Sequence, residues 1–397
     1  VTDANSLLTQ IAGLHKQIIA ARGGPEANDL LDQRDLLVTK LAEIVGVRAV
    51  DRTDGTVQLA LTGTGVLLVD GTSTALLTAT VNTTTDTVDL TAGTSNIAVT
   101  PQSGALGSIV TARNSATGAV KQAVSDLNSL ASTIIAEVNR LHASGTGVTE
   151  HASLTAANAV SSSAVALTAA GLPYTPVTGS FKVIVHDSSG ALLSSTPVAV
   201  TAGVTTLTDI ETALDGITNL SASISGGKLT ITAASGTTFT FASDTSDALM
   251  ALGLNTFFTG SDAFGIAVNS VVANDATKIA AAQADANGLV HPGDGANALA
   301  IARLRTKLAM TSGTATFGSY YGTLVSRVGT QTRDALAGVD QQQAAVQVVQ
   351  SLQQQTSGVS TDEEIINLTQ SQNAYAATAR YVAILQNVFD TLIGLVR

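Results

Sequence analysis

The sequence predicts an α+β protein of several domains, in which a coiled-coil stalk of long helices carries two inserted antiparallel β-rich domains. In three separate stretches, apolar residues recur at alternating steps of three and four, the period of a helix that packs against another helix. Two other stretches alternate apolar and polar residues between glycine-containing turns, as antiparallel strands do. At 397 residues, the chain has room for about two to four domains.

Residues 1–46 are predicted to form the N-terminal part of the stalk as a helical hairpin. The apolar side of the first helix consists of Leu7, Ile11, Leu14 and Ile18. Gly23-Gly24-Pro25 ends this helix, since proline and glycine disfavour its continuation. We expect Asn28 to cap the second helix and Asp29 to lie in its first turn, where the helix dipole favours a carboxylate.

Residues 47–103 are predicted to form the first inserted β domain. Asp54-Gly55 is typical of a hairpin turn, and apolar residues alternate with polar ones from Val57 to Leu61. Further short strands are expected at Val66–Val69, Thr78–Val81, Val88–Leu90 and Ile97–Val99.

Residues 104–147 are predicted to supply a stalk helix. Its heptad side consists of Val120, Val124, Leu127, Ala131, Ile134, Val138 and Leu141. We expect this side to pack against the hairpin of residues 1–46, which would make the first β domain an insertion in the stalk.

Residues 148–272 are predicted to form a second inserted, β-rich outer domain that is rich in Ser, Thr and Ala. Gly226-Gly227 is typical of a tight turn. The strand after this turn carries Leu229 and Ile231 on one face, and we expect that face to meet the apolar pair Phe239 and Phe241.

Residues 273–357 are predicted to form the C-terminal part of the stalk. A helix is expected within residues 295–310, and a long helix from about Tyr320 to Gln355. Apolar residues along the long helix include Tyr321, Leu324, Val328, Ala335, Val349 and Leu352. We expect the N-terminal helices to cover this side, but only in part, because the middle of the helix is rich in glutamine (Gln341-Gln342-Gln343).

Residues 358–397 are predicted to form a terminal assembly helix, which begins with a capping box of Ser360 and Glu363. Its heptad side, the terminal seam, consists of Ile365, Leu368, Gln372, Tyr375, Ala379, Val382, Gln386, Phe389, Ile393 and Val396. Burying its eight apolar members would contribute on the order of 10 kcal/mol. Either the chain's own stalk or other protein could cover this seam. We expect other protein, because a new helix begins here and because glutamine at Gln372 and Gln386 selects register and partner.

Composition excludes several other functions. The net charge of −11 argues against nucleic acid and anionic membranes, which attract clustered Lys and Arg, and no apolar run is long enough to cross a bilayer. The chain contains no Cys, and its five histidines have no metal-ligand spacing. It carries none of the common catalytic or phosphate-binding motifs. The sequence therefore predicts no catalytic residue, cofactor or metal. Since the chain starts at Val1, we expect an N-terminal segment to be missing.

Two segments resemble flagellar hook-associated protein 1, a family of junction proteins between the hook and the filament of bacterial flagella. NDLLDQRDLLVTKLAEIVGV (28–47) resembles a signature of this family, and GVSTDEEIINLTQSQNAYAATARYVAILQNVFDTLIGLVR (358–397) resembles the terminal helix shared by flagellar rod, hook and filament proteins. GALGSIVTARN (104–114) and NRLHASG (139–145) are also similar to the family.

The resemblance implies an extracellular structural protein that passes unfolded through the flagellar type III export apparatus. It implies as partners further copies in a ring or tube, the hook protein, the second junction protein and an export chaperone. An N-terminal helix of the family would pair with residues 361–397. The alternative is a secreted surface adhesin or glycan-binding module, in which residues 148–260 would carry the function.

Overall fold

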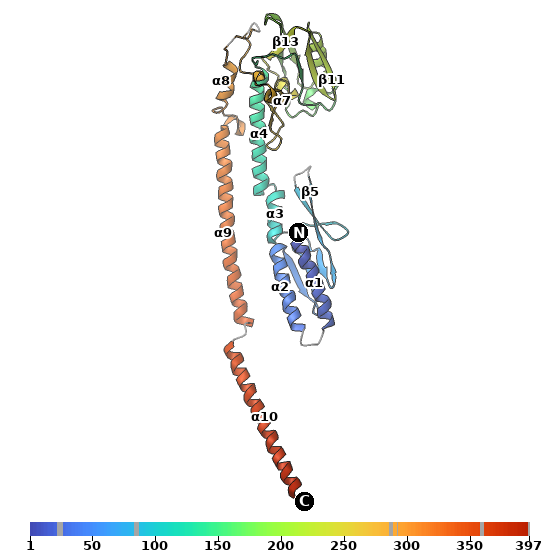
Figure 1. Cartoon of the computed structure of the whole chain (residues 1–397), viewed down its shortest axis with the longest axis vertical. Coiled ribbons are helices and arrows are strands. Elements are labelled where there is room, and N and C mark those ends of the chain that lie inside the picture. Colours follow the sequence, from blue (N-terminus) through green and yellow to red (C-terminus); the bar gives the residue numbers. More distant parts are fainter. Residues whose placement is uncertain (22–26, 83–86, 286–288, 292, 358–360, 396–397) are drawn as a thin grey trace. The chain divides into compact units, whose positions relative to one another are not determined.

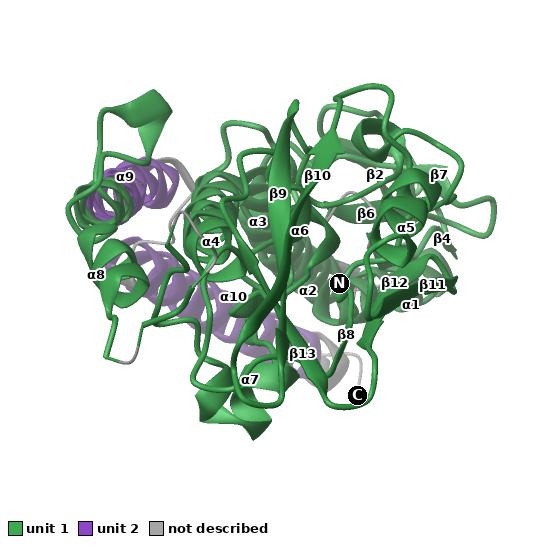
Figure 2. Ribbon diagram, turned by 90° about the horizontal axis from the view of Figure 1, so that it is seen from above, with its two compact units in different colours: residues 1–328 green, residues 329–397 purple. Residues whose placement is uncertain are grey.

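The computed structural model describes residues 1–21, 27–82, 87–285, 289–291, 293–357 and 361–395. The chain forms two compact units, Val1–Val328 and Gly329–Arg397, coloured green and purple in Figure 2. Helices and several small antiparallel sheets make this a mixed α and β protein.

Most helices belong to the first unit. They are α1 (Thr2–Ala20), α2 (Ala27–Ile44), α3 (Gly104–Asn114), α4 (Ala119–Ala143), α5 (Leu207–Asp215), α6 (Ala248–Leu252), α7 (Ser270–Asn274) and α8 (Ala296–Arg303). The described residues also form the short 3-10 helices η1 (Leu167–Ala169), η2 (Ala276–Lys278) and η3 (Thr311–Gly313). The long helix α9 (Phe317–Ser357) begins in the first unit, and α10 (Thr361–Leu395) lies in the second. Asn28 lies inside α2 rather than at its cap, because the helix begins one residue earlier, at Ala27.

A first group of strands lies beside α1 and α2 (Figure 1). One sheet contains β1 (Val47–Asp51), β2 (Val57–Leu61), β3 (Leu67–Asp70) and β4 (Ser73–Thr74), in that order. A second contains β5 (Leu77–Asn82), β6 (Thr87–Ala92) and β7 (Ile97–Ala98). The alternating residues Val57, Leu59 and Leu61 are buried, and they share one hydrophobic core with Leu8 of α1 and Leu41 of α2.

A second group of strands gathers at the C-terminal end of α4 (Figure 1). Its strands are β8 (Ser153–Thr155), β9 (Gly179–Asp187), β10 (Leu192–Val200), β11 (Leu220–Ser225), β12 (Lys228–Ala233), β13 (Thr237–Ala242), β14 (Phe258–Thr259) and β15 (Ala267–Val268). They form the antiparallel sheets β10-β9-β13, β11-β12-β8 and β14-β15. Leu229 and Ile231 of β12 lie in a different sheet from Phe239 and Phe241 of β13, yet all four side chains are fully buried in one core.

The turn between β11 and β12 offers a matched pair of glycine substitutions. Gly226 and Gly227 both have positive φ, +56° and +75°. A Cβ on Gly226 would meet open space, whereas a Cβ on Gly227 would lie 2.4 Å from the carbonyl oxygen of Val160. We expect Gly226→Ala to destabilise the protein by about 1–2 kcal/mol, and Gly227→Ala by about 1–3 kcal/mol more because of the added clash.

Urea unfolding followed by circular dichroism measures both losses. Equal losses in the two variants would contradict the close approach of Val160 to this turn.

The packing partners of α4 differ from our prediction. We expected its heptad side to pack on the hairpin of residues 1–46, but α4 contacts α3, α6, α8 and β14. Ala131, Ile135 and His142 are buried there, while Val120 and Val124 nearer its start are exposed. The hairpin α1–α2 packs against β1, β3 and β4 instead, because its apolar side chains share one hydrophobic core with those of β2 and β3.

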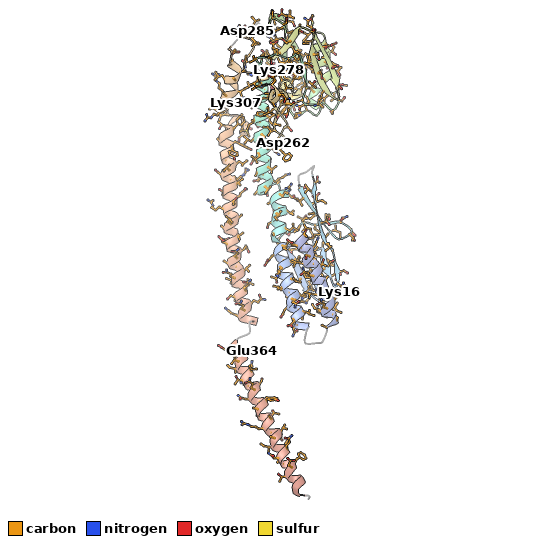
Figure 3. All side chains as sticks on the ribbon, viewed as in Figure 1. Lys16, Asp262, Lys278, Asp285, Lys307 and Glu364 are labelled. Atoms are coloured by element: carbon orange, nitrogen blue, oxygen red, sulfur yellow. The ribbon has the colours of Figure 1, made fainter. Side chains whose placement is uncertain are left out.

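The start of α9 lies along α4. Leu324 is buried, the hydroxyl of Tyr320 donates to Asp126 on α4 over 3.1 Å, and Arg327 forms an ion pair with the same carboxylate. Lys307, which precedes α9 and is labelled in Figure 3, forms an ion pair with Glu137 of α4 at 2.6 Å. These polar contacts fix the first three turns of α9 within the first unit.

Candidate assembly surface

The terminal seam lies on α10 and faces solvent. The helix starts with Asp362, Glu363 and Glu364 in its first turn, and these carboxylates suit the positive end of the helix dipole; Glu364 is labelled in Figure 3. Ser360, the other half of the predicted capping box, lies outside the described residues.

Every described side chain of the terminal seam is exposed. They are Ile365, Leu368, Gln372, Tyr375, Ala379, Val382, Gln386 and Phe389. Tyr375 is 80% exposed and Phe389 is 63% exposed. Ile393 lies on the described backbone of α10, but its side chain and all of Val396 lie outside the described residues. A helix with this apolar stripe gains stability only when another surface buries it.

α10 carries additional exposed apolar residues that the sequence analysis missed. They are Ile366, Tyr381, Ile384, Leu385 and Val388. Tyr381, Leu385 and Val388 each stand one position before a seam residue, so they form a second stripe about 100° around the helix from the seam. The signal was present in the sequence, but a search for one heptad stripe does not detect a wider apolar arc. An arc of this width indicates more than one neighbouring helix.

The part of α9 that belongs to the second unit carries a similar stripe. At alternating steps of four and three it presents Ala335, Val339, Gln342, Val346 and Val349. All five are exposed, and Val349 is 63% exposed. The sequence predicted that the apolar side of this helix is only partly buried. Among its described side chains Leu324 is buried, and the part in the second unit presents an exposed apolar stripe.

Four of the five histidines are buried side chains. His15, His142, His151 and His186 are buried, and each has a hydrogen-bond partner. Burial lowers the pKa of His151 to about 4. Within the described residues, no group of three or more His, Cys, Asp or Glu is placed to hold a metal ion. In that same part of the chain, no helix combines the length and the apolar character that crossing a membrane requires.

The aromatic residues of the outer β-rich part do not form an exposed binding platform. Phe181, Phe239 and Phe241 are fully buried in its core, where their rings pack edge to face. Phe257 and Phe258 pack against each other, and Phe257 also packs on His142. Phe264, by contrast, is fully exposed, so this part offers one exposed ring rather than the aromatic platform that the glycan-binding alternative requires.

The fold and this surface together define a class of protein: a mixed α and β protein whose helices α9 and α10 carry exposed apolar stripes at heptad spacing. Residues 1–154 match the family described as flagellar hook-associated protein FlgK, helical domain. Over 415 residues the chain is 30% identical to flagellar hook-associated protein 1 of Salmonella typhimurium, and the match covers 100% of this chain and 70% of that protein. It is 29% identical over 419 residues to the protein of the same name from Escherichia coli K12, with the same shares covered.

The chain therefore belongs to the flagellar hook-associated protein 1 family. It is also similar to the solved structure of the flagellar hook junction protein FlgK from Burkholderia pseudomallei, with 18% identity and a TM-score of 0.49 over 90% of this chain and 83% of that one.

Proposed function

We propose that this protein is a non-enzymatic structural component of the bacterial flagellum that joins the hook to the filament. The observation that carries the proposal is the match of the whole chain to hook-associated protein 1. The exposed terminal seam of α10 supplies a surface for assembly, and the protein works outside the cell.

The mechanism is burial of helical stripes against other helices. The six described apolar residues of the seam are Ile365, Leu368, Tyr375, Ala379, Val382 and Phe389. Full burial of such side chains stabilises by about 1.5–3 kcal/mol each, less for alanine, which amounts to on the order of 10 kcal/mol. Gln372 and Gln386 select the register, because a glutamine in a seam needs a polar partner at the same level.

The domains have different tasks in this proposal. Residues 1–46, 104–147 and 273–357 form the helical stalk, which becomes a coiled coil when the exposed stripe of α9 is covered. The β-rich parts, 47–103 and 148–272, project from the stalk. The terminal helix of residues 358–397 pairs with an N-terminal helix of the family.

The partners follow from the same surfaces. Further copies of the protein lie side by side in a ring or tube, with the hook protein on one side and the second junction protein on the other. The second stripe of α10 gives the helix a further neighbour in this assembly. Before assembly an export chaperone covers the terminal helix, since an exposed apolar arc of this width promotes aggregation.

Circular dichroism of peptides tests the pairing. We expect a peptide of residues 358–397 to gain helix when it is mixed with the N-terminal helix of the family, because an isolated helix is marginal in water. A Val382→Asp version of the peptide should gain little. No gain for the natural peptide would contradict the proposed pairing, and so would an equal gain for both.

A further inference from the structure

Two buried histidines, in separate parts of the first unit, make the same pair of backbone hydrogen bonds. His15 of α1 is fully buried. Its Nδ1 lies 2.6 Å from the carbonyl oxygen of Gly71, and its Nε2 accepts the amide of Val57 over 3.3 Å. It therefore ties α1 to β2 and to the turn between β3 and β4.

His142, at the end of α4, repeats this pattern. It is also fully buried. Its Nδ1 lies 2.7 Å from the carbonyl oxygen of Asn255, and its Nε2 accepts the amide of Ala280 over 3.0 Å. Asn255 follows α6 and Ala280 follows η2, so His142 ties α4 to two segments of the second β-rich part.

These partners fix the protonation state of both rings. A backbone amide can only donate, so Nε2 must be unprotonated, and a carbonyl can only accept, so Nδ1 must carry the hydrogen. Both histidines are therefore neutral in the folded protein. A second proton on Nε2 would set one donor against another and would break the bond to Val57 or to Ala280.

We propose that His15 and His142 are proton-sensitive clasps, each of which fastens a β-rich part of the chain to its helix and releases it in acid. The proposal concerns the folded chain itself and does not depend on its assembly. Its consequence is that acid loosens the β-rich parts while the helices remain folded.

The charged groups around His15 change its pKa less than burial does. Burial lowers the pKa of His15 from its ordinary 6.5, the carbonyl of Gly71 opposes this, and Arg34 lowers it further. Asp54 raises this pKa and Arg52 lowers it, with smaller effects.

Burial is also the main cause that lowers the pKa of His142, opposed by the carbonyl of Asn255. The groups around it are engaged with one another: Arg140 pairs with Asp247 and Glu137, and Lys278, labelled in Figure 3, donates to the carbonyl of Glu150. Burial also lowers the pKa of the neighbouring His151, so protonation of this ring in acid destabilises the folded state as well. Burial raises the pKa of Asp244, so protonation of this carboxylate has the opposite effect on stability.

The sign of the pH dependence follows from these shifts. Both histidines have a lower pKa in the folded state than in the released state. The stability of each clasp is therefore complete above about pH 6.5 and is lost as the pH falls toward the folded pKa. Each pH unit within this window lowers the protection of the clasped amides up to about tenfold.

Hydrogen exchange with mass spectrometry, corrected for intrinsic rates, tests the proposal on the whole chain at about pH 7.5 and about pH 5. We expect the protection of the amides around Val57 and around Ala280 to fall in acid, by up to about tenfold for each pH unit below about 6.5. His142→Gln keeps an acceptor for the Ala280 amide but cannot take up a proton. It should weaken the acid response at Ala280, where His151 still contributes, and leave the response at Val57 unchanged. His15→Gln is the matched control and should do the reverse.

An unchanged acid response at the altered site would overturn the proposal, as would the absence of any response in the natural protein. Each variant contains an internal check of folding, because the untouched clasp reports on the rest of the chain. If a variant does not fold, NMR titration of the two histidine rings in the natural protein tests the proposal instead. Normal titration near pH 6.5 with intact amide protection would also overturn the proposal.

Discussion

Bacteria that carry Val382→Asp together with Phe389→Asp will build hooks without attached filaments and release filament subunits into the medium. Both residues lie on the terminal seam and are exposed, at 47% and 63%. Burial of each natural side chain contributes about 1.5–3 kcal/mol, and an unpaired buried carboxylate adds a desolvation cost of several kcal/mol. Electron microscopy of the hooks and immunoblots of the medium measure the outcome.

The control is a variant with the same added charge on the opposite side of the helix. Asn373→Asp with Asn387→Asp changes two exposed polar residues of α10 that lie away from the seam. We expect normal filaments from this variant. Normal filaments from the seam variant would count decisively against the assembly mechanism, and loss of filaments in both variants would assign the effect to charge alone.

The terminal seam could be predicted because its information is local. Consecutive residues such as Val382, Gln386 and Phe389 fix one stripe through the helical period alone. The breadth of the apolar arc was missed because the search looked for a two-helix seam, whereas Tyr381, Leu385 and Val388 widen it. Strand positions such as Val57–Leu61 were predictable for the same local reason, the two-residue period of a half-buried strand.

The partners of α4 could not be predicted, because they depend on contacts between residues distant in the sequence. The heptad period of α4 predicts that one side of the helix is buried, but it does not identify the elements that bury it. In the structure α4 packs against α6, α8 and β14, and side chains such as Asn139 and Asn297 make the polar contacts between these elements. In a sequence, an asparagine is typical of turns and caps, so these residues gave no sign of a buried role.

Asparagines form a buried polar network at the end of α4. Asn139 accepts the amides of Phe257 and Phe258, and Asn297 donates to the carbonyls of Leu141 and Ala280. Asn297 thereby satisfies the carbonyl of Leu141 in the last turn of α4, where carbonyls lack helical partners. The other bonds join Asn139 and Asn297 to backbone groups of Phe257, Phe258 and Ala280, which lie outside α4. This network fixes how the second β-rich part is attached, and no periodicity encodes it.

Asn255→Asp is expected to destabilise this attachment by about 3 kcal/mol or more at neutral pH. The Asn255 side chain is buried, and its amide nitrogen donates to the carbonyls of His142, Ala143 and Gly145 over 3.2, 3.3 and 2.9 Å. A carboxylate of the same shape would place negative charge against three carbonyl oxygens. The neutral ring of His151, whose Nε2 lies 3.2 Å from Oδ1 of Asn255, offers this charge at most one hydrogen bond. A buried charge without a counter-ion costs about 3–5 kcal/mol, and the opening free energy from hydrogen exchange at residues 141–146 measures the loss.

The pH dependence of the stability of Asn255→Asp distinguishes two causes of its loss: the buried negative charge, or poorer packing of the new side chain. Burial and the three carbonyls would raise the pKa of the introduced carboxyl, so the folded state would bind its proton more tightly than the unfolded state. The deficit relative to the natural protein should therefore shrink as the pH falls. Asn219→Asp is the matched control, because Asn219 also has positive φ, at 67°, but is exposed; we expect it to change stability by less than about 0.5 kcal/mol. If the two variants lose equal stability, or if the Asn255→Asp deficit is independent of pH, the amide of Asn255 does not hold the end of α4.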